Sequence, residues 1–393
     1  MINDMALIKE YGSIAFLSTY PPQECGLATF TRDLITAMGN IGINSTEVNA
    51  VSDTSGISYD NKVTARIRKN ERGDYVKAAQ RLNASHVDLL MVEHEYGIFG
   101  GEHGEYVLDL VENLEIPVVT TLHTILSEPD MKQRSIINAL SKRSEKIITM
   151  AGNTKQMLQS IYGVDPWKIE VIHHGVPKKI IVSKEDLKKK YGYQGKRIIS
   201  TFGLIGPGKG LEYGIEAMSK VVEDNSDIMY LILGQTHPAL KEEGISYRNK
   251  LEELVKKLDL CENVKFVNKY LSIDEIIQYL QMSDIYMTPY TGKDQAVSGT
   301  MAYAVGYGKA IVSTPYLYAK EMLSEGRGML AEFNNPQSLA GCVNYLFQNP
   351  YKRLKMERDT AKIGRTMYWD KVALRYAGVI LKTIKSVPET GVV

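Results

Sequence analysis

A glycine-rich loop that ends in a lysine has spacing suited to phosphate chemistry. The stretch FGLIGPGKG places Gly203, Gly208 and Lys209 in the G-x-x-x-x-G-K spacing of a P-loop. Gly210 stands where a P-loop has the hydroxyl that binds magnesium, and no convincing Walker B strand accompanies it. Backbone N–H groups before a helix attract anions. We therefore expect phosphate binding without a structural magnesium; the alternative is a plain turn with a surface lysine.

A second polar loop lies in TPYTGKDQAVSGTMAYAVGYGKAIVSTPY (288–316), between a predicted strand and a predicted helix. Ser298, Gly299 and Thr300 occupy the expected helix N-terminus, where free N–H groups could hold a phosphate. Asp294 and Gln295 come directly before them. The alternative is an ordinary capped helix, because Ser and Thr are common caps.

A third loop, STYPPQECGLATFTRDL (18–34), follows the first predicted strand. Pro21 and Pro22 predict an extended turn, and Gly26 opens a helix at a point where a ligand could approach the backbone. The alternative is a turn glycine. Cys25 could be a nucleophile, but inert thiols are more common.

Histidines and carboxylates gather in VEHEYGIFGGEHGEY (92–106), which contains Glu93, His94, Glu95, Glu102 and His103. The spacing is not H-E-x-x-H, so we favour a polar loop at a strand end over a metal site. Glu95 is a candidate for substrate binding.

A further histidine, His123, ends the run PVVTTLH and would stand at the lip of the first sheet. A lone histidine is usually structural, but a position at the carboxyl end of a strand favours function. We interpret His173 and His174 as structural. No Ser-His-Asp or Cys-His set emerges, which argues against a hydrolase or a thiol enzyme.

The composition is that of a globular protein with two domains. The 393 residues are 44% hydrophobic with a net charge of +1, which gives no argument for nucleic acid. Three separated cysteines favour a reducing, cytoplasmic environment over a disulfide framework. We see no signal peptide at the N-terminus and no apolar run of transmembrane length.

Strand and helix patterns alternate along both halves of the chain, which predicts an α/β fold with two parallel sheets. A lysine-rich linker is expected at 173–197, with Lys188, Lys189 and Lys190 as a solvated helix end. The tail 367–387 is expected to be helical. Strands are expected at 13–18, 44–51, 87–94, 117–123, 146–150, 169–174, 197–203, 228–234, 263–268, 284–290 and 309–314.

In their order and spacing, these segments resemble retaining glycosyltransferases of the GT-B type, family 4, over nearly the whole length. CGLATFTRDLITAM is similar to the N-terminal glycine loop of that family, and VVTTLHTIL to its strand-end histidine segment. FGLIGPGKGLEYGIEAM is similar to its G-R-x-x-x-x-K-G loop, and GYGKAIVSTPY to its A-x-G-x-P-V-V-A-T segment. The tail around Trp369 resembles the final helix, which in this family returns to the first domain.

The resemblance implies two Rossmann-like domains that face an interdomain cleft, with boundaries at 1–177 plus 367–393 and at 178–366. The first would bind a carbohydrate or glycoconjugate acceptor, and the second a nucleotide-sugar donor. Lys209, the Gly26 N–H and the amides of residues 298–300 would hold the donor phosphate, with Gly208 in the same loop. His123 would lie beside the donor sugar. Neither a cofactor nor a metal is implied.

Three positions depart from the family pattern. Leu204 replaces the arginine of the glycine loop, and the two glutamates of the family's E-x7-E motif fall at Gln295 and Tyr303. Gln295 can still hydrogen-bond a sugar, and Asp294 could substitute after a shift of one residue. Tyr303 cannot chelate a ribose diol as a carboxylate does.

These departures leave two alternatives to a nucleotide-sugar transferase. One is a glycoside phosphorylase on the same fold, because inorganic phosphate needs less of the nucleotide site. The other is a non-catalytic sugar- or nucleotide-binding homologue. Peripheral membrane association through the lysines at 184–190 is a further hypothesis, with little support from the net charge of +1.

Overall fold

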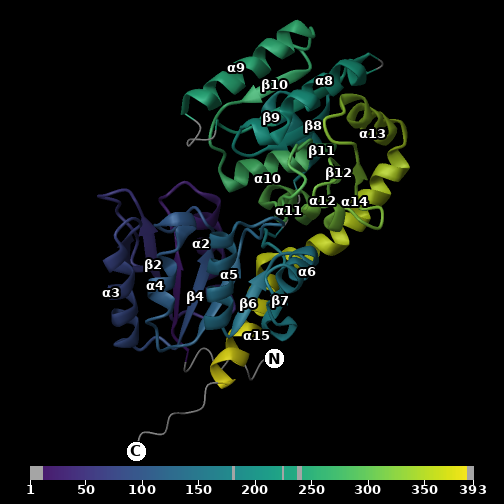
Figure 1. The fold of residues 1–393 in the computed structure, drawn as a ribbon. Coiled ribbons are helices and arrows are strands. Elements are labelled where there is room, and N and C mark those ends of the chain that lie inside the picture. Colours follow the sequence, from purple (N-terminus) through teal and green to yellow (C-terminus); the bar gives the residue numbers. More distant parts are fainter. Residues whose placement is uncertain (1–11, 179–181, 224, 237–240, 387–393) are drawn as a thin grey trace, which may run out of the picture. The chain divides into compact units, whose positions relative to one another are not determined.

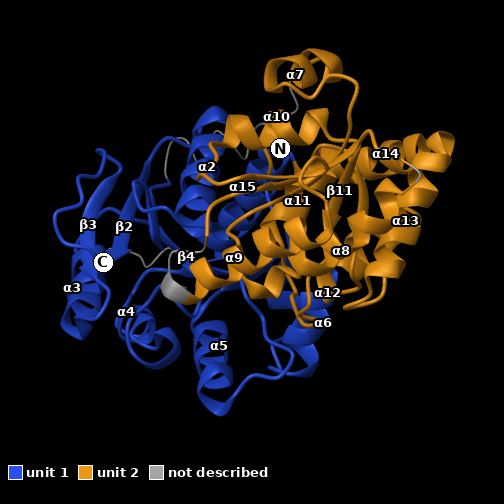
Figure 2. Cartoon of the chain, turned by 90° about the horizontal axis from the view of Figure 1, so that it is seen from above, with its two compact units in different colours: residues 1–175, 368–393 blue, residues 176–367 orange. Residues whose placement is uncertain are grey.

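The computed structural model of the protein describes residues 12–178, 182–223, 225–236 and 241–386 (Figure 1). The chain forms two compact units, shown in different colours in Figure 2: Met1–Gly175 with Tyr368–Val393, and Val176–Met367. The N-terminal segment used for the signal-peptide prediction lies mostly outside the described residues, as do 179–181 of the expected linker and the end of the tail.

The first unit is built on a seven-stranded sheet in the order β3-β2-β1-β4-β5-β6-β7, with every neighbouring pair parallel. Its central strands are wholly buried, as expected for a sheet covered on both faces. The strands are β1 Ile14–Ser18, β2 Thr46–Ser52, β3 Val63–Arg68, β4 Leu89–His94, β5 Val118–Leu122, β6 Lys146–Thr149 and β7 Ile169–Val171.

Helices of this unit connect successive strands except β2 and β3, and the C-terminal helix α15 joins them. Along α15, Val372, Tyr376 and Val379 form a buried stripe, as the 3.6-residue period predicts. Trp369 packs edge-on against Phe30 of α2, with ring centroids 5.3 Å apart. The helices are α2 Gly26–Asn40, α3 Arg72–Asn83, η1 Glu102–Gly104, α4 Val107–Val111, α5 Met131–Arg143, α6 Gly152–Ser160, η2 Pro166–Lys168 and α15 Trp369–Ser386.

The second unit repeats this plan with a six-stranded parallel sheet in the order β10-β9-β8-β11-β12-β13. Its core lies between β8, β9 and β11 and the helices α8, α9 and α13. The strands are β8 Arg197–Phe202, β9 Ile228–Leu233, β10 Val264–Val267, β11 Ile285–Thr288, β12 Ala310–Ser313 and β13 Met329–Leu330.

Local capping signals set several helix starts in this unit. Ser272 and Glu275 form a reciprocal capping box at α10, and the hydroxyl of Ser183 caps α7. The helices are α7 Lys184–Tyr191, η3 Pro207–Lys209, α8 Leu211–Val222, α9 Lys241–Lys257, α10 Ile273–Met282, α11 Gly299–Gly306, α12 Leu317–Met322, α13 Pro336–Gln348, α14 Pro350–Gly364 and η5 Arg365–Met367.

The predicted α/β fold is confirmed, and every predicted strand segment overlaps an observed strand. Two strands were not predicted. The strand β3, VTARIR, lies at a sheet edge, and its exposed arginines alternate with half-buried Ala65 and buried Ile67 instead of forming an apolar run. The strand β13 has only two residues.

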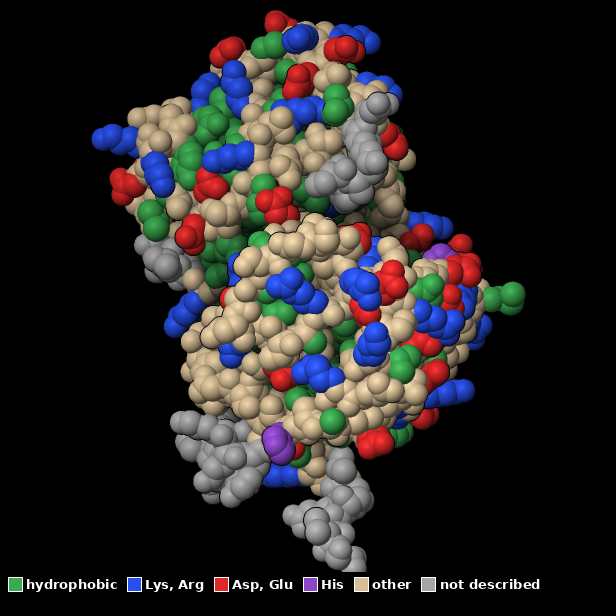
Figure 3. Space-filling view, turned by 90° about the vertical axis from the view of Figure 1, so that its left-hand side faces the viewer, with side chains coloured by type: hydrophobic (Ala, Val, Ile, Leu, Met, Phe, Trp, Pro, Cys, Tyr) green, Lys and Arg blue, Asp and Glu red, His purple; other side chains and the backbone are tan. Residues whose placement is uncertain are grey.

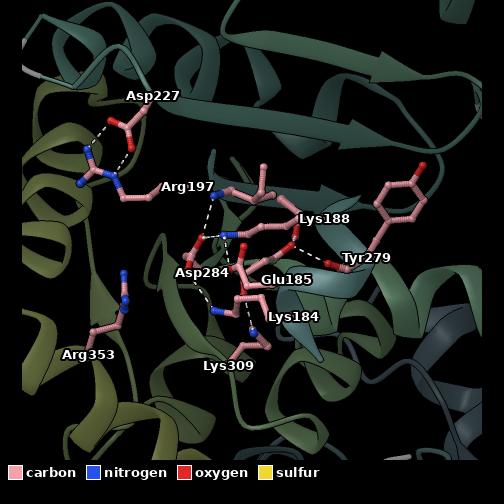
Figure 4. Close-up of polar contacts among 12 residues, drawn as sticks. Lys184, Glu185, Lys188, Arg197, Asp227, Tyr279, Asp284, Lys309 and Arg353 are labelled. Carbon is pink, nitrogen blue, oxygen red and sulfur yellow. Dashed lines mark hydrogen bonds and ion pairs between the residues drawn. The ribbon is translucent and has the colours of Figure 1, made fainter. Parts of the chain in front are cut away.

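The prediction of a solvated lysine run at 188–190 is wrong for Lys188, as Figure 4 shows. Its side chain is only 7% exposed, and Nζ lies 3.5 Å from Asp284 Oδ2, while Lys184 Nζ lies 2.9 Å from Oδ1. Asp284 also accepts the Ile198 N–H at 2.8 Å. Burial alone would raise the pKa of Asp284, but the lysines and this N–H hold it below its ordinary value. The cluster fastens α7 to the amino end of the sheet.

The surface carries both signs of charge. On the face shown in Figure 3, Lys and Arg side chains are interspersed with Asp and Glu. Among the helices that the structure describes, none is long and apolar enough to cross a membrane. Of the lysines considered above for lipid contact, Lys184 and Lys188 are paired with Asp284.

Candidate functional site

Each sheet has one point at which the strand order reverses. In the first unit it lies between β1 and β4, and in the second between β8 and β11. Ligands of doubly wound sheets bind outside the carboxyl ends of the strands at such points. The loops before α2, after β4, before α8 and before α11 all leave these strand ends, so the fold alone marks them as candidate sites.

In the second unit, the glycine–lysine loop is shaped by Gly210. This residue has φ of +58°, and a Cβ on it would lie 2.1 Å from the carbonyl oxygen of Pro289. A Ser or Thr at this position would therefore collide with the neighbouring loop. The sequence explains the missing P-loop hydroxyl by phosphate binding that needs no magnesium. The structure adds a steric reason, since only glycine fits at this position.

Lys209 is joined to the N-terminus of α11 through one tyrosine. Its Nζ donates to the Tyr290 hydroxyl at 3.1 Å and lies 4.2 Å from the ring centroid. The Tyr290 hydroxyl is 2.9 Å from Thr300 Oγ1, which is 3.2 Å from Ser298 Oγ. Ser298 caps α11 by accepting the Met301 N–H. The structure therefore brings Lys209, Ser298 and Thr300 together, with Gly299 as the first residue of the helix.

Tyr290 itself is held rigidly. It is 1% exposed and stacks on buried Tyr316 with centroids 5.3 Å apart and planes 17° apart. The hydroxyl of Thr314 donates to its backbone carbonyl at 2.6 Å. A cation fixed over an aromatic face beside a helix N-terminus is an arrangement that can bind an anionic group.

The other predicted residues of this unit lie outside that hydrogen-bonded chain. Asp294 and Gly208 are exposed. Gln295 Nε2 donates to the Val297 carbonyl at 3.1 Å within its own loop. Tyr303, on α11, is half-buried and edge-on to Phe202 at 6.2 Å. Leu204 lines a small hollow together with Lys209.

In the first unit, Gly26 is the first residue of α2, and a Cβ on it would meet no atom within 4 Å. Contacts among the described residues therefore do not require a glycine here, and the approach of a ligand stays a prediction. Cys25 serves as the N-cap, because its sulfur accepts the Ala28 N–H at 3.3 Å. That contact gives the thiol a structural role.

His123 follows β5 and is paired with a carboxylate. Its Nε2 lies 2.8 Å from Glu93 Oε2, and Glu93, in β4, is fully buried. The imidazole is edge-on to Phe30, with ring centroids 4.7 Å apart, and its backbone N–H donates to the His94 carbonyl at 3.0 Å. Glu95 holds the next residue, since its Oε2 accepts the hydroxyl of Thr124 at 2.5 Å.

Two neighbouring histidines are unsuited to carrying charge. Burial, and to a lesser degree the nearby His123, lower the pKa of His94 to about 3. Burial likewise lowers the pKa of His174 to about 4, although its hydrogen bond to the Gly175 carbonyl opposes the change. Both are neutral at pH 7, in line with the structural interpretation of His174.

Sequence reasoning missed the partners of the two most promising side chains. The sequence pattern places Tyr290 only at the end of a strand and Glu93 only within a group of histidines and carboxylates. A signal was present for Glu93, because it and His123 end adjacent parallel strands at the same sheet edge. None was present for Tyr290, which lies 81 positions from Lys209 in sequence. Within the part of the chain that the structure describes, no cluster of three or more potential metal ligands occurs.

Comparison with known families matches both units. Residues 183–366 match the glycosyl transferases of group 1, and residues 26–179 match glycosyltransferase family 4. The chain belongs to the glycosyltransferases. Its curated relatives include an uncharacterised glycosyltransferase of Methanocaldococcus jannaschii, 24% identical over 64% of this chain and 62% of that protein. Spore coat protein SA of Bacillus subtilis is 22% identical over 58% of this chain and 62% of its own length. The matches thus span 62% of the length of these two relatives.

Several solved structures share the fold of this glycosyltransferase. A glycosyltransferase from Rickettsia africae has a TM-score of 0.75 at 18% identity and covers 95% of this chain and 99% of its own. Sucrose-phosphate synthase of Thermosynechococcus elongatus has a TM-score of 0.77 at 14% identity, over 96% and 100%. Anabaena HepE, solved with UDP and glucose, has a TM-score of 0.73 at 15% identity, over 95% and 100%. These likenesses confirm a GT-B fold of two Rossmann-like domains.

Proposed function

We propose that this glycosyltransferase transfers a hexose from a nucleotide-diphosphate sugar, of the GDP-mannose or UDP-glucose type, to a hydroxyl of a sugar or glycoconjugate. The observation that carries the proposal is Lys209, held by Tyr290 beside the N-terminus of α11 at the switch point of the second sheet. Charge develops on the leaving diphosphate during transfer, and a fixed cation with helix amides stabilises it. Anabaena HepE, which was solved with UDP-glucose and shares the fold, supports this donor class.

The proposed reaction uses no metal and retains the configuration of the anomeric carbon. The bond between that carbon and the phosphate oxygen breaks, the acceptor oxygen bonds on the same face, and the donor phosphate takes the acceptor proton. In this reaction the donor phosphate is bound by Lys209, Ser298, Gly299, Thr300 and the Gly26 N–H. His123 lies beside the donor sugar. Asp294, Gln295 and Tyr303 are the proposed replacements for the family's carboxylates.

Calorimetry with UDP, GDP and ADP sugars tests the proposal directly. We expect one nucleotide class to bind below millimolar concentration, with EDTA having no effect, and Lys209→Ala to weaken that binding. Absence of binding by every nucleotide sugar at millimolar concentration would contradict the proposal.

The altered positions Leu204, Gln295 and Tyr303 also make a glycoside phosphorylase a candidate. Incubation with oligosaccharides and inorganic phosphate distinguishes it, because a phosphorylase releases a sugar 1-phosphate. For a transferase we expect no such product. Sugar 1-phosphate formed without any nucleotide would replace the proposed function by this one.

A further inference from the structure

The carboxylate of Glu93 is buried without a permanent cation beside it. It is fully enclosed, and among the described residues it has no lysine or arginine partner. Its contacts are Nε2 of His123 at 2.8 Å and the hydroxyl of Thr121 at 3.4 Å. Burying a carboxylate is unfavourable unless a partner compensates it. Among the described residues, His123 makes the shorter of the two hydrogen bonds to this carboxylate.

The surroundings of Glu93 give it one orientation. It lies on β4 beside Thr121 of β5, and the Thr121 hydroxyl is 3.3 Å from the hydroxyl of Tyr376 on α15. Tyr376 is fully buried, so the sheet and the C-terminal helix enclose this side of the carboxylate. The oxygen that faces His123 is therefore fixed by packing.

The imidazole of His123 is fixed from the other side. Phe30 packs edge-on against this ring, and the side chain of His123 is 12% exposed. A carboxylate only accepts hydrogen bonds, so Nε2 carries the proton. In the described part of the chain, Nδ1 of His123 has no hydrogen-bond partner, although the ring is not fully enclosed. The neutral ring therefore presents a lone pair, and not an N–H, at Nδ1.

We propose that Glu93 is a positioning residue which holds His123 as the Nε2–H tautomer, so that Nδ1 accepts a hydrogen bond from a hydroxyl of the donor sugar. This inference rests on the proposed function for its ligand, but the tautomer is a property of the chain alone. It makes Glu93 a determinant of specificity, because a sugar without a hydroxyl at that place leaves Nδ1 unpaired.

The tautomer is tested by nitrogen NMR of the full chain labelled with 15N-histidine, with His123→Asn to assign the signal. We expect His123 to show a protonated Nε2 and an unprotonated Nδ1 at neutral pH. In Glu93→Gln, the amide can either donate or accept, so the signal should move toward a mixture of tautomers. An Nδ1–H tautomer in the wild-type chain would overturn the proposal even if the variant did not fold.

Asp130→Asn is the matched control. Asp130 Oδ2 lies 2.9 Å from His103 Nε2, so the chain contains a second carboxylate–histidine pair, in this case half-exposed. Asn also keeps the cap of α5 that Asp130 provides. We expect the His123 signal to be unchanged in this variant. An equal change in both variants would show that the signal does not report on Glu93.

Ligand binding separates this inference from the proposed function. Adding UDP-glucose or GDP-mannose should shift Nδ1 of His123, whereas UDP or GDP alone should not. For a donor that turns over, Glu93→Gln should lower kcat by about tenfold to a hundredfold, as for partners that orient metal-binding histidines, with a smaller change in KM. Identical shifts with sugar and nucleotide would overturn the role at the sugar. Absence of transfer with every donor would contradict the proposed function but not the tautomer.

Discussion

Lysines lie at both ends of the second unit's sheet, but their partners differ. At the amino end, Lys184 and Lys188 share the buried carboxylate of Asp284 (Figure 4). At the carboxyl end, Lys209 contacts the hydroxyl and ring of Tyr290, and it has no carboxylate partner among the residues described. The lysines at the amino end are bound to a carboxylate within the fold, while Lys209 remains available to an anion.

A lysine without a carboxylate partner is the better candidate for binding an anionic substrate. A buried ion pair gives little net stability over an apolar replacement, but it becomes costly when one partner is removed. A cation over an aromatic ring keeps its full charge and part of its hydration. Changes at the amino end should therefore alter stability, and changes at the carboxyl end should alter turnover and binding.

The largest expected effect is that of Asp284→Ala on stability. It leaves Lys188, 7% exposed, without its buried partner, and we expect the free energy of unfolding to fall by about 3–5 kcal/mol. Urea unfolding measures this. Asp227→Ala is the control at the same sheet end, since Asp227 pairs with Arg197 but is 43% exposed, and its loss should stay within about 1 kcal/mol. Equal losses would remove the distinction between the two pairs.

Acid should weaken the amino end selectively. Because the pKa of Asp284 is lowered on folding, the folded state binds fewer protons than the unfolded state in the acid range. Its contribution is fully present above the ordinary carboxyl value of 3.8 and is lost as the pH falls through the lower, folded value. Unfolding measured from pH 6 downward should show a steeper loss for the wild-type chain than for Asp284→Asn. Parallel curves would contradict the lowered pKa.

Lys209→Ala should have the next largest effect, on turnover. Loss of one preorganised charge at the departing phosphate is expected to lower kcat by about a hundredfold to a thousandfold. The free energy of unfolding should change by less than about 0.5 kcal/mol, because no buried carboxylate is left unpaired. Lys220→Ala, on the exposed surface of α8, is the control. An unchanged kcat would show that Lys209 does not carry the charge.

Gly210→Ser tests why this loop departs from a P-loop. The positive φ disfavours a side chain by about 1–2 kcal/mol, and the contact with the Pro289 carbonyl adds to that loss of stability. Gly208→Ser, where a Cβ meets no atom within 4 Å, should change stability by less than about 0.5 kcal/mol. Thermal unfolding and activity with and without magnesium measure both. Magnesium-dependent activity in Gly210→Ser would favour the P-loop interpretation instead.

Sequence patterns were sufficient for the fold because buried parallel strands are short, mostly apolar runs, which β1, β4 and β5 illustrate. They also placed Lys209 and Ser298 at loop ends that the structure joins. They failed where the deciding partner is distant in sequence: Lys188 pairs with a carboxylate 96 positions away. Pairing of this kind depends on strand order, which local periodicity does not specify.

The smallest expected effect concerns the hydroxyl that links Lys209 to Thr300. Tyr290→Phe keeps the ring under Nζ but removes both hydrogen bonds, at 3.1 and 2.9 Å. Losing one net hydrogen bond should weaken donor binding by about 1 kcal/mol, or roughly fivefold in Kd. Tyr318→Phe is the control, because that buried hydroxyl has no hydrogen-bond partner among the described residues, and Kd should not change. If Tyr290→Phe binds donor as well as the wild-type chain, the ring alone positions Lys209. The ring of Tyr290, and not the hydrogen bonds from Lys209 to Thr300, would then distinguish the carboxyl end of this sheet from its amino end.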